Sequence, residues 1–171
     1  FWYMNTYSDR RWKSAQSFGR VGETEPWVDE TPDSNQRFQI ASQFQVSQVL
    51  DNNQTGSLIA MTFNEFGHII ASREGNGLML VVDSNGDGLP DKINEYCDKV
   101  TNCQGILALN GDVYVTADGP QGPALYRLSD EDQDGKLEYV RALVEFDGTI
   151  GEHGPHGIVL GPDGLIYVVV G

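Results

Sequence analysis

Oxygen-bearing side chains recur at alternate positions in the segment DSNGDGLPD, residues 83–91. Its first, third, fifth and ninth residues are Asp83, Asn85, Asp87 and Asp91. Gly88 is sixth, where the lack of a side chain permits a sharp backbone reversal, and Leu89 is seventh, where only the backbone carbonyl can be a ligand. Calcium takes roughly six to eight oxygens, so this spacing predicts a calcium-binding loop.

A second segment of the same kind, DEDQDGKLE, spans residues 130–138. Its predicted ligands are Asp130, Asp132, Asp134, Lys136 through its backbone carbonyl, and Glu138. Neither segment has the glutamate that a helical calcium hand carries at about position twelve, because Asn94 and Arg141 stand there. The flanking residues are β-branched, aromatic and alternating, which predicts calcium-binding turns of β-hairpins. The alternative is a pair of solvated acidic turns without metal. A bound ion of this kind is far more often a structural element than a catalyst.

Composition limits the classes of partner. The chain has 171 residues, enough for one domain with a real core, and its net charge of −14 argues against nucleic acid and anionic membrane surfaces. No apolar run approaches the ~20 residues of a membrane span, and no signal peptide opens the chain. The chain begins at Phe1 and stops at Gly171 directly after a predicted strand, so we expect it to be part of a longer protein.

Cys97 and Cys103 are the two cysteines of the chain. They are too few for a zinc site, and no CxxCH motif for haem attachment is present. We expect a disulfide that closes a small loop, with two free thiols as the alternative. A disulfide implies an oxidising compartment, and weak calcium sites are filled where calcium is millimolar. Both expectations favour a periplasmic or extracellular location.

The distribution of apolar residues predicts an irregular N-terminal arm or linker over residues 1–36 and a β-rich region over 37–171. Alternation of apolar and polar residues predicts an edge or outer strand over 37–50, followed by a turn at 51–56. Further strands are predicted at 57–63, 68–72, 77–82, 92–97, 105–109, 112–117, 124–128, 139–146, 157–160 and 165–170.

These strands repeat along the chain. The two acidic loops start 47 residues apart, at Asp83 and Asp130, and the first-hairpin glycines Gly67, Gly111 and Gly164 are 44 and 53 residues apart. Four strands per unit with a period of roughly 45–50 residues are typical of β-propeller blades. The predicted fold is therefore all-β, a partial β-propeller of four-stranded blades with calcium-binding hairpin loops. It would hold about two blades and the start of a third. A β-sandwich is the competing architecture, but it does not account for the repeat.

The end of the chain, GEHGPHGIVLGPDGLIYVVVG, resembles the H-x-x-x-x-L-x-x-GPDG-x-LY-x-x-x-G signature of soluble quinoprotein glucose dehydrogenases and glucose/sorbosone dehydrogenase-like propellers. A closer resemblance is to the propeller domain of the "membrane-bound dehydrogenase" proteins of planctomycete-type bacteria. These carry a DTDGDG-x-x-D loop, an LxDTDGDGKxD loop and an H-x-x-x-GL-x-x-G-x-D stretch in the order found here. The resemblance covers residues 38–171.

The resemblance implies a role for His153, which lies eight residues before Gly161. In the quinoprotein dehydrogenases the histidine at this position removes a hydroxyl proton from the sugar as hydride passes to pyrroloquinoline quinone. Two departures bear on this expectation. His156 stands where that family often has glycine, and the basic residues that hold the quinone lie further along those chains. The simpler interpretation of His153 is a loop histidine bonded to backbone groups.

Other polar residues are weaker candidates. His68 lies within a strand pattern and is expected to pack or to be exposed at an edge. Arg73, Glu74 and Asp118 follow predicted inner strands and could reach a channel mouth, although a surface ion pair or turn cap is the simpler interpretation.

Two functions remain open. The first is an exported quinone-dependent dehydrogenase that oxidises a sugar or other alcohol and passes electrons to a cytochrome or other subunit. The second is a non-catalytic, calcium-braced propeller that binds or supports partners in a larger extracellular or periplasmic assembly. A hydrolase is disfavoured because no GxSxG motif is present.

Overall fold

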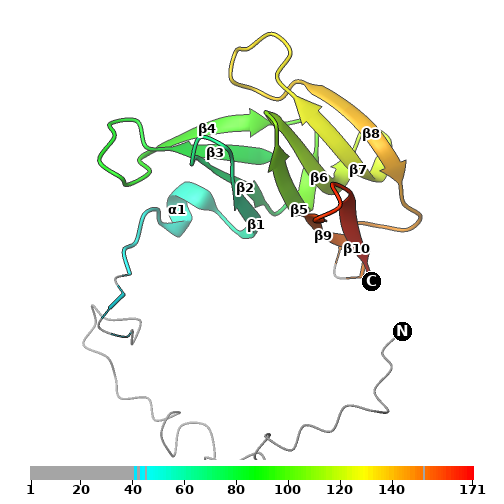
Figure 1. Cartoon of the computed structure of the whole chain (residues 1–171), viewed down its shortest axis with the longest axis horizontal. Helices are drawn as coiled ribbons and strands as arrows, with labels where there is room; N and C mark the ends of the chain where they lie inside the picture. The colour runs from blue at the N-terminus through cyan, green and yellow to red at the C-terminus, as the bar shows by residue number, and fades with distance from the viewer. Residues whose placement is uncertain (1–40, 42, 45, 152) are drawn as a thin grey trace, which may run out of the picture. The chain divides into compact units, whose positions relative to one another are not determined.

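The computed structural model describes residues 41, 43–44, 46–151 and 153–171, and the chain divides into two units, Phe1–Ser47 and Gln48–Gly171. All helices and strands of the described residues lie in the second unit (Figure 1). The predicted N-terminal arm, residues 1–36, lies outside the described residues.

The second unit is built from antiparallel sheets whose strands follow one another in sequence order. The first sheet contains β1 (Leu58–Phe63), β2 (Ile69–Arg73), β3 (Leu78–Val82) and β4 (Lys92–Cys97). The second contains β5 (Thr101–Leu109), β6 (Asp112–Gly119), β7 (Gly122–Ser129) and β8 (Tyr139–Glu145). A third, two-stranded sheet contains β9 (Pro155–Leu160) and β10 (Ile166–Val170). The all-β class and the four-stranded units are confirmed, and none of these sheets closes on itself.

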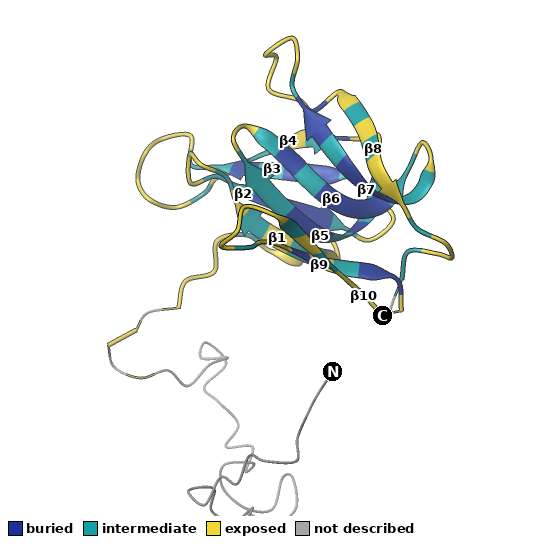
Figure 2. Ribbon diagram, turned by 45° about the vertical axis from the view of Figure 1, so that its right-hand side comes forward, coloured by how far each residue is buried: buried dark blue, intermediate teal, exposed yellow. Residues whose placement is uncertain are grey.

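The core lies between the first and second sheets. Its members include Ile70 and Leu78 from the first sheet and Val115, Tyr126 and Leu128 from the second, all fully buried. Figure 2 shows buried residues concentrated in β5, β6 and β7, whereas β8 alternates between intermediate and exposed positions. The second sheet is therefore covered on both faces, and its outermost strand borders solvent.

Successive sheets pack in the same relation. β5 contacts β1 and β2, and β9 contacts β5 and β6. The hydroxyl of Ser72 in β2 donates to the Cys103 carbonyl in β5 at 2.6 Å, and the hydroxyl of Thr116 in β6 donates to the His156 carbonyl in β9 at 2.6 Å. Each hydrogen bond runs from the second strand of one sheet to the first strand of the next. The units that repeat in the sequence thus also pack on one another through equivalent strands.

One strand prediction is wrong for the described residues. Those between 41 and 50 form no strand, while 37–40, 42 and 45 lie outside the description. The predicted turn at 51–56 contains a short helix, α1 (Asn52–Thr55). Its cause is a capping box: an Asp51 carboxylate oxygen accepts the Asn53 and Gln54 N–H groups, and the Gln54 side chain accepts from Asp51 N–H.

The predicted disulfide is also wrong. Cys97 at the end of β4 and Cys103 in β5 are free thiols, both buried in the core between the sheets. They pack there as small apolar side chains, and burial raises the pKa of both thiols. The expectation of an oxidising compartment therefore loses this support.

Candidate metal centre

The two acidic loops occupy matching places in the fold. Residues 83–91 connect β3 to β4, and residues 130–138 connect β7 to β8, so each loop joins the last two strands of a four-stranded sheet (Figure 1). The paired strands fix the two ends of each loop at hairpin distance. This is the position that the sequence predicted.

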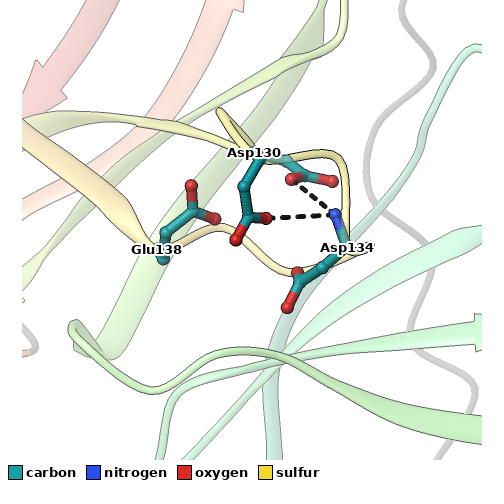
Figure 3. A group of neighbouring side chains, drawn as sticks. Asp130, Asp134 and Glu138 are labelled. Carbon is teal, nitrogen blue, oxygen red and sulfur yellow. Dashed lines mark hydrogen bonds between the residues drawn. The ribbon is translucent and has the colours of Figure 1, made fainter.

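The second loop brings its acidic side chains together. One carboxylate oxygen from each of four residues lies within 4.8 Å of the others, and Figure 3 labels Asp130, Asp134 and Glu138 on the loop. The group consists of Asp130, Asp132, Asp134 and Glu138. Asp130 is half-buried and the other three are exposed. Four carboxylates this close repel one another unless a cation lies among them.

Backbone N–H groups hold these carboxylates in place. The Asp134 N–H donates to Asp130 Oδ1 at 3.2 Å and to Asp132 Oδ1 at 3.1 Å (Figure 3). The Gly135 N–H donates to the second Asp130 oxygen at 2.9 Å, and the Glu131 N–H donates to Glu138 Oε1 at 2.8 Å. The first residue of the loop is thereby tied to its middle, and the last residue is tied to the second.

The first loop has the same pattern. The Asp87 N–H donates to Asp83 and Asn85, the Gly88 N–H donates to Asp83 Oδ2 at 2.7 Å, and the Ser84 N–H donates to Asp91 Oδ1 at 2.8 Å. The backbone hydrogen bonds to Asp83, led by that of Gly88, lower the pKa of its carboxyl. Two segments with different sequences thus share one set of contacts.

Backbone conformation explains the glycines. The fourth residue of each loop, Gly86 or Gln133, has a φ of 77° or 62°, and the sixth, Gly88 or Gly135, has a φ of 88° or 91°. Both positions lie in the left-handed region that glycine enters without steric cost. The glycine predicted to reverse the chain is at the position that requires it.

The side chains at the seventh position are directed elsewhere. Leu89 is exposed, and the ammonium of Lys136 pairs with Glu95 Oε1 of β4 at 3.2 Å. Neither side chain is available to a cation, so a contribution of these residues through their carbonyls stays a prediction.

The loops differ in charge. The second offers four carboxylates, whereas the first has the amide Asn85 at its third position, and its Nδ2 donates to Asp91 Oδ2 at 3.3 Å. Among the described residues, the second loop is the single group in which at least three acidic, His or Cys side chains converge this closely. An all-oxygen donor set at the tip of a hairpin suits a hard cation such as calcium better than zinc.

One contact of the second loop was not predicted. Leu137 is buried in the core, and its N–H donates to the Tyr96 carbonyl of β4 at 2.7 Å. The loop is therefore attached to the preceding sheet as well as to its own. An apolar residue inside an acidic loop was the available signal, since the first loop has Pro90 at this position.

His153 lies apart from these loops. It is exposed in the turn that precedes β9, and among the described residues no hydrogen bond or ion pair joins it to Arg73, Glu74 or Asp118. Arg73 ends β2, and its Nε is buried without a hydrogen-bond partner. No hydrogen bond or ion pair of the described residues thus links the weaker candidates to His153.

His68 and His156 have backbone roles. The His68 N–H donates to Asn64 Oδ1 at 2.9 Å in the turn between β1 and β2, and the His156 carbonyl accepts from Thr116. His68 lies in the turn just before β2, where its side chain is partly exposed. These contacts position turns and sheets.

The fold and the loops define an all-β protein of antiparallel four-stranded sheets with an acidic cluster that could hold a metal ion. The chain belongs to the DUF7133 family, described as a domain of unknown function, whose model matches residues 30–171. No curated protein and no solved structure matches the chain. In the part that the structure describes, no helix is long and apolar enough to cross a membrane.

Proposed function

We propose that the chain is a calcium-braced portion of a β-propeller that acts as a binding or scaffold module in a larger assembly. The observation that carries this proposal is the shared hydrogen-bond pattern of the two loops, together with the four converging carboxylates of the second. Calcium, rather than a generic cation, is favoured by flexible carboxylate and carbonyl donors in loops of this length.

The propeller architecture is supported by the repeated packing of successive sheets. In a propeller, each four-stranded blade packs face to face on the next around a common axis. The hydrogen bonds from Ser72 to Cys103 and from Thr116 to His156 repeat one relation between neighbours, as blades would. On this interpretation β1–β4 and β5–β8 are two blades, and β9–β10 are the first strands of a third.

Calcium would act at the outer edge of each blade. It would neutralise the clustered carboxylates and stiffen the hairpin that links the last two strands. In the second blade, Leu137 and Lys136 also contact β4 of the first, so an ordered loop would hold two blades together. Two ions would remove about four of the negative charges and leave the surface acidic. Weak sites of this kind are filled where calcium is abundant, which favours a periplasmic or extracellular location.

Calcium affinity of two single-charge variants of the whole chain tests this proposal. Asp134→Asn removes a predicted ligand, whereas Glu131→Gln removes the same charge from the same loop outside the cluster. We expect Asp134→Asn to weaken calcium binding at the second loop by about tenfold or more, and Glu131→Gln to weaken it by less than about threefold. Equal effects of the two variants would show a diffuse acidic surface instead of a site.

A quinone-dependent dehydrogenase is the second candidate. It is supported by the resemblance of residues 151–171 to the quinoprotein signature and by the exposure of His153 beside the first strand of a sheet. The described residues next to His153 in sequence are Gly151, Gly154, Pro155 and His156. They provide no set of basic side chains for a quinone, so we derive no catalytic step through pyrroloquinoline quinone.

Dye-linked oxidation of sugars or alcohols by the complete protein, supplied with calcium and pyrroloquinoline quinone, separates the two candidates. His153→Ala is compared with His68→Ala, which alters a histidine in a turn of the first blade. Turnover that only His153→Ala abolishes would establish the dehydrogenase and make electron transfer to a cytochrome partner the next question. Absence of turnover and of quinone uptake in folded, calcium-loaded protein leaves the scaffold.

A further inference from the structure

Leu137 connects the second acidic loop to the core between the sheets. Its side chain is 1% exposed and belongs to the same core cluster as Cys97 and Cys103. Its neighbours in sequence, Lys136 and Glu138, are both predicted calcium ligands, one through its carbonyl and the other through its carboxylate. An ion bound to both neighbours would therefore fix the backbone on each side of a core residue.

Contacts with β4 hold Leu137 in the core. Its N–H donates to the Tyr96 carbonyl at 2.7 Å, and the ammonium of the preceding Lys136 pairs with Glu95 at 3.2 Å. Both side chains of this ion pair are more than half exposed, so the pair contributes little to stability. The position of Leu137 therefore depends on its own burial, on one backbone hydrogen bond and on the conformation of the loop.

Cys97 lies beside Leu137 at the end of β4. The two residues line one cavity of about 220 Å³, together with Lys136 and Glu138 of the loop. The Cys97 side chain is only 3% exposed, so a movement of the loop away from β4 would widen this cavity and uncover the thiol. Cys103 of β5 is fully buried and does not line the cavity, so the same movement would leave it covered.

We infer that calcium at the second loop controls access to the Cys97 thiol. With the ion bound, Leu137 stays in the core and Cys97 is covered. Without it, the clustered carboxylates repel one another, the loop opens away from β4, and the thiol becomes accessible. This inference rests on the proposed calcium site and adds the way in which that site would regulate the contact between the first two sheets.

The first loop cannot act in the same way. Its eighth residue, Pro90, occupies the position of Leu137 and has no N–H to donate to a neighbouring strand. This loop leads into Lys92 at the start of β4, whereas Cys97 is the last residue of that strand. Access to Cys97 should therefore depend on calcium at the second loop and not at the first.

The rate at which iodoacetamide labels each cysteine of the whole chain, at one pH and with either calcium or a chelator, tests the inference. Trypsin cleaves after Lys99, between Cys97 and Cys103, so mass spectrometry of the peptides gives a separate rate for each thiol. Cys103 reports unfolding of the whole domain. Calorimetric titration of calcium into the same samples shows whether the ion binds.

Three variants separate the contributions. Asp134→Asn and Asp87→Asn make the same change at the fifth position of the second and the first loop. Leu137→Ala shortens the side chain that covers Cys97 and leaves every predicted ligand in place. Circular dichroism establishes that each variant is folded, and the two aspartate variants decide the outcome if Leu137→Ala is not.

In metal-free protein we expect Cys97 to be labelled faster than Cys103. Free calcium at about 100 times its dissociation constant suppresses an opening that releases the ion by about 100-fold, so Cys97 labelling should slow by about 10- to 100-fold. At that calcium concentration Asp134→Asn should reduce the protection about tenfold or more, and Asp87→Asn should keep it. Leu137→Ala should lose the protection of Cys97 while it still binds calcium and Cys103 stays protected.

The possible failures are distinguishable. Absence of calcium binding in calorimetry would contradict the proposed function, and the inference with it. Calcium binding that Asp134→Asn weakens, with no change in Cys97 labelling, would overturn the inference alone. Equal labelling rates for the two cysteines, or equal effects of Asp134→Asn and Asp87→Asn, would also overturn it, because the thiols would then be reached by unfolding of the whole domain.

Discussion

At the scale of single residues, the site depends on which side-chain oxygens stand at alternate positions of a nine-residue loop. The convergence of four carboxylates in the second loop was predictable from residue type and spacing, because a short hairpin loop brings such positions together whatever surrounds it. The hydrogen bonds that fix each carboxylate come from the loop's own backbone. A local sequence therefore encodes a local site.

The amide at position three of the first loop leads to the first prediction. Asn85→Asp gives this loop the four carboxylates of the second, so its calcium affinity should rise roughly threefold to tenfold. In metal-free protein the same change should lower Tm, because the added charge repels Asp83 and Asp91. Calorimetric titration and thermal unfolding with and without calcium measure both effects. Weaker binding by Asn85→Asp would show that the amide is not at a ligand position.

Glu65 leads to a prediction about pH. Its own backbone N–H, and next that of Gly111 at 3.0 Å in the adjacent sheet, lower the pKa of this carboxyl below its ordinary value of 4.5. A lowered pKa in the folded state stabilises the fold above about pH 4.5, and this stabilisation is lost as pH falls through the lowered value. Glu65→Gln should therefore be less stable than the unaltered chain near neutral pH, by less than about 1 kcal/mol since the group is exposed.

Urea unfolding from pH 7 down to pH 3 measures the difference between Glu65→Gln and the unaltered chain. The two should converge at acidic pH. A difference that stays constant across this range would mean that the Glu65 charge is not what links the two turns.

At the scale of elements, the strands were predictable from the sequence, but the contacts between neighbouring sheets were not. Alternating β-branched and aromatic residues and the turns at Asn64–Gly67 and Asn110–Gly111 determine each hairpin locally, so β1 to β10 lie within a few residues of their predicted ranges. The strand predicted over 37–50 has no such hairpin partner and does not form among its described residues. The hydrogen bonds from Ser72 to Cys103 and from Leu137 to Tyr96 of β4 join residues far apart in sequence. No local pattern specifies them.

Gly105 is the clearest example of a residue that allows close contact between two sheets. A Cβ at this position would lie 2.3 Å from the His156 carbonyl oxygen of β9, so the glycine allows the second and third sheets to approach closely. Gly105→Ala should lower the free energy of unfolding by about 1–3 kcal/mol, because backbone must move to admit the methyl group.

Gly157→Ala is the matched control, since a Cβ there meets nothing within 4 Å. It should change the free energy of unfolding by less than about 0.5 kcal/mol. Urea denaturation of both variants makes the comparison. Similar values for the two would contradict the close approach of β5 and β9.

At the scale of the whole molecule, the repeat explains both what the sequence predicted and what it could not. A period of strands and loops predicts like units, but how one unit packs on the next depends on the residues at their faces. Among the described residues, Ser72 and Thr116 each donate a hydrogen bond to the next sheet, whereas the side chain of Val169 is exposed. Burial of Cys97 and Cys103 in the core between two sheets likewise follows from packing, which the spacing of the cysteines did not reveal.

The central claim is that the two loops bind calcium, and calorimetric titration of calcium into the metal-free whole chain tests it most directly. We predict two ions per chain, with dissociation constants between about 10⁻⁶ and 10⁻³ M, and a higher Tm when calcium is in excess. No heat of binding and no change in Tm at about 10 mM calcium, in protein shown to be folded, would contradict the claim.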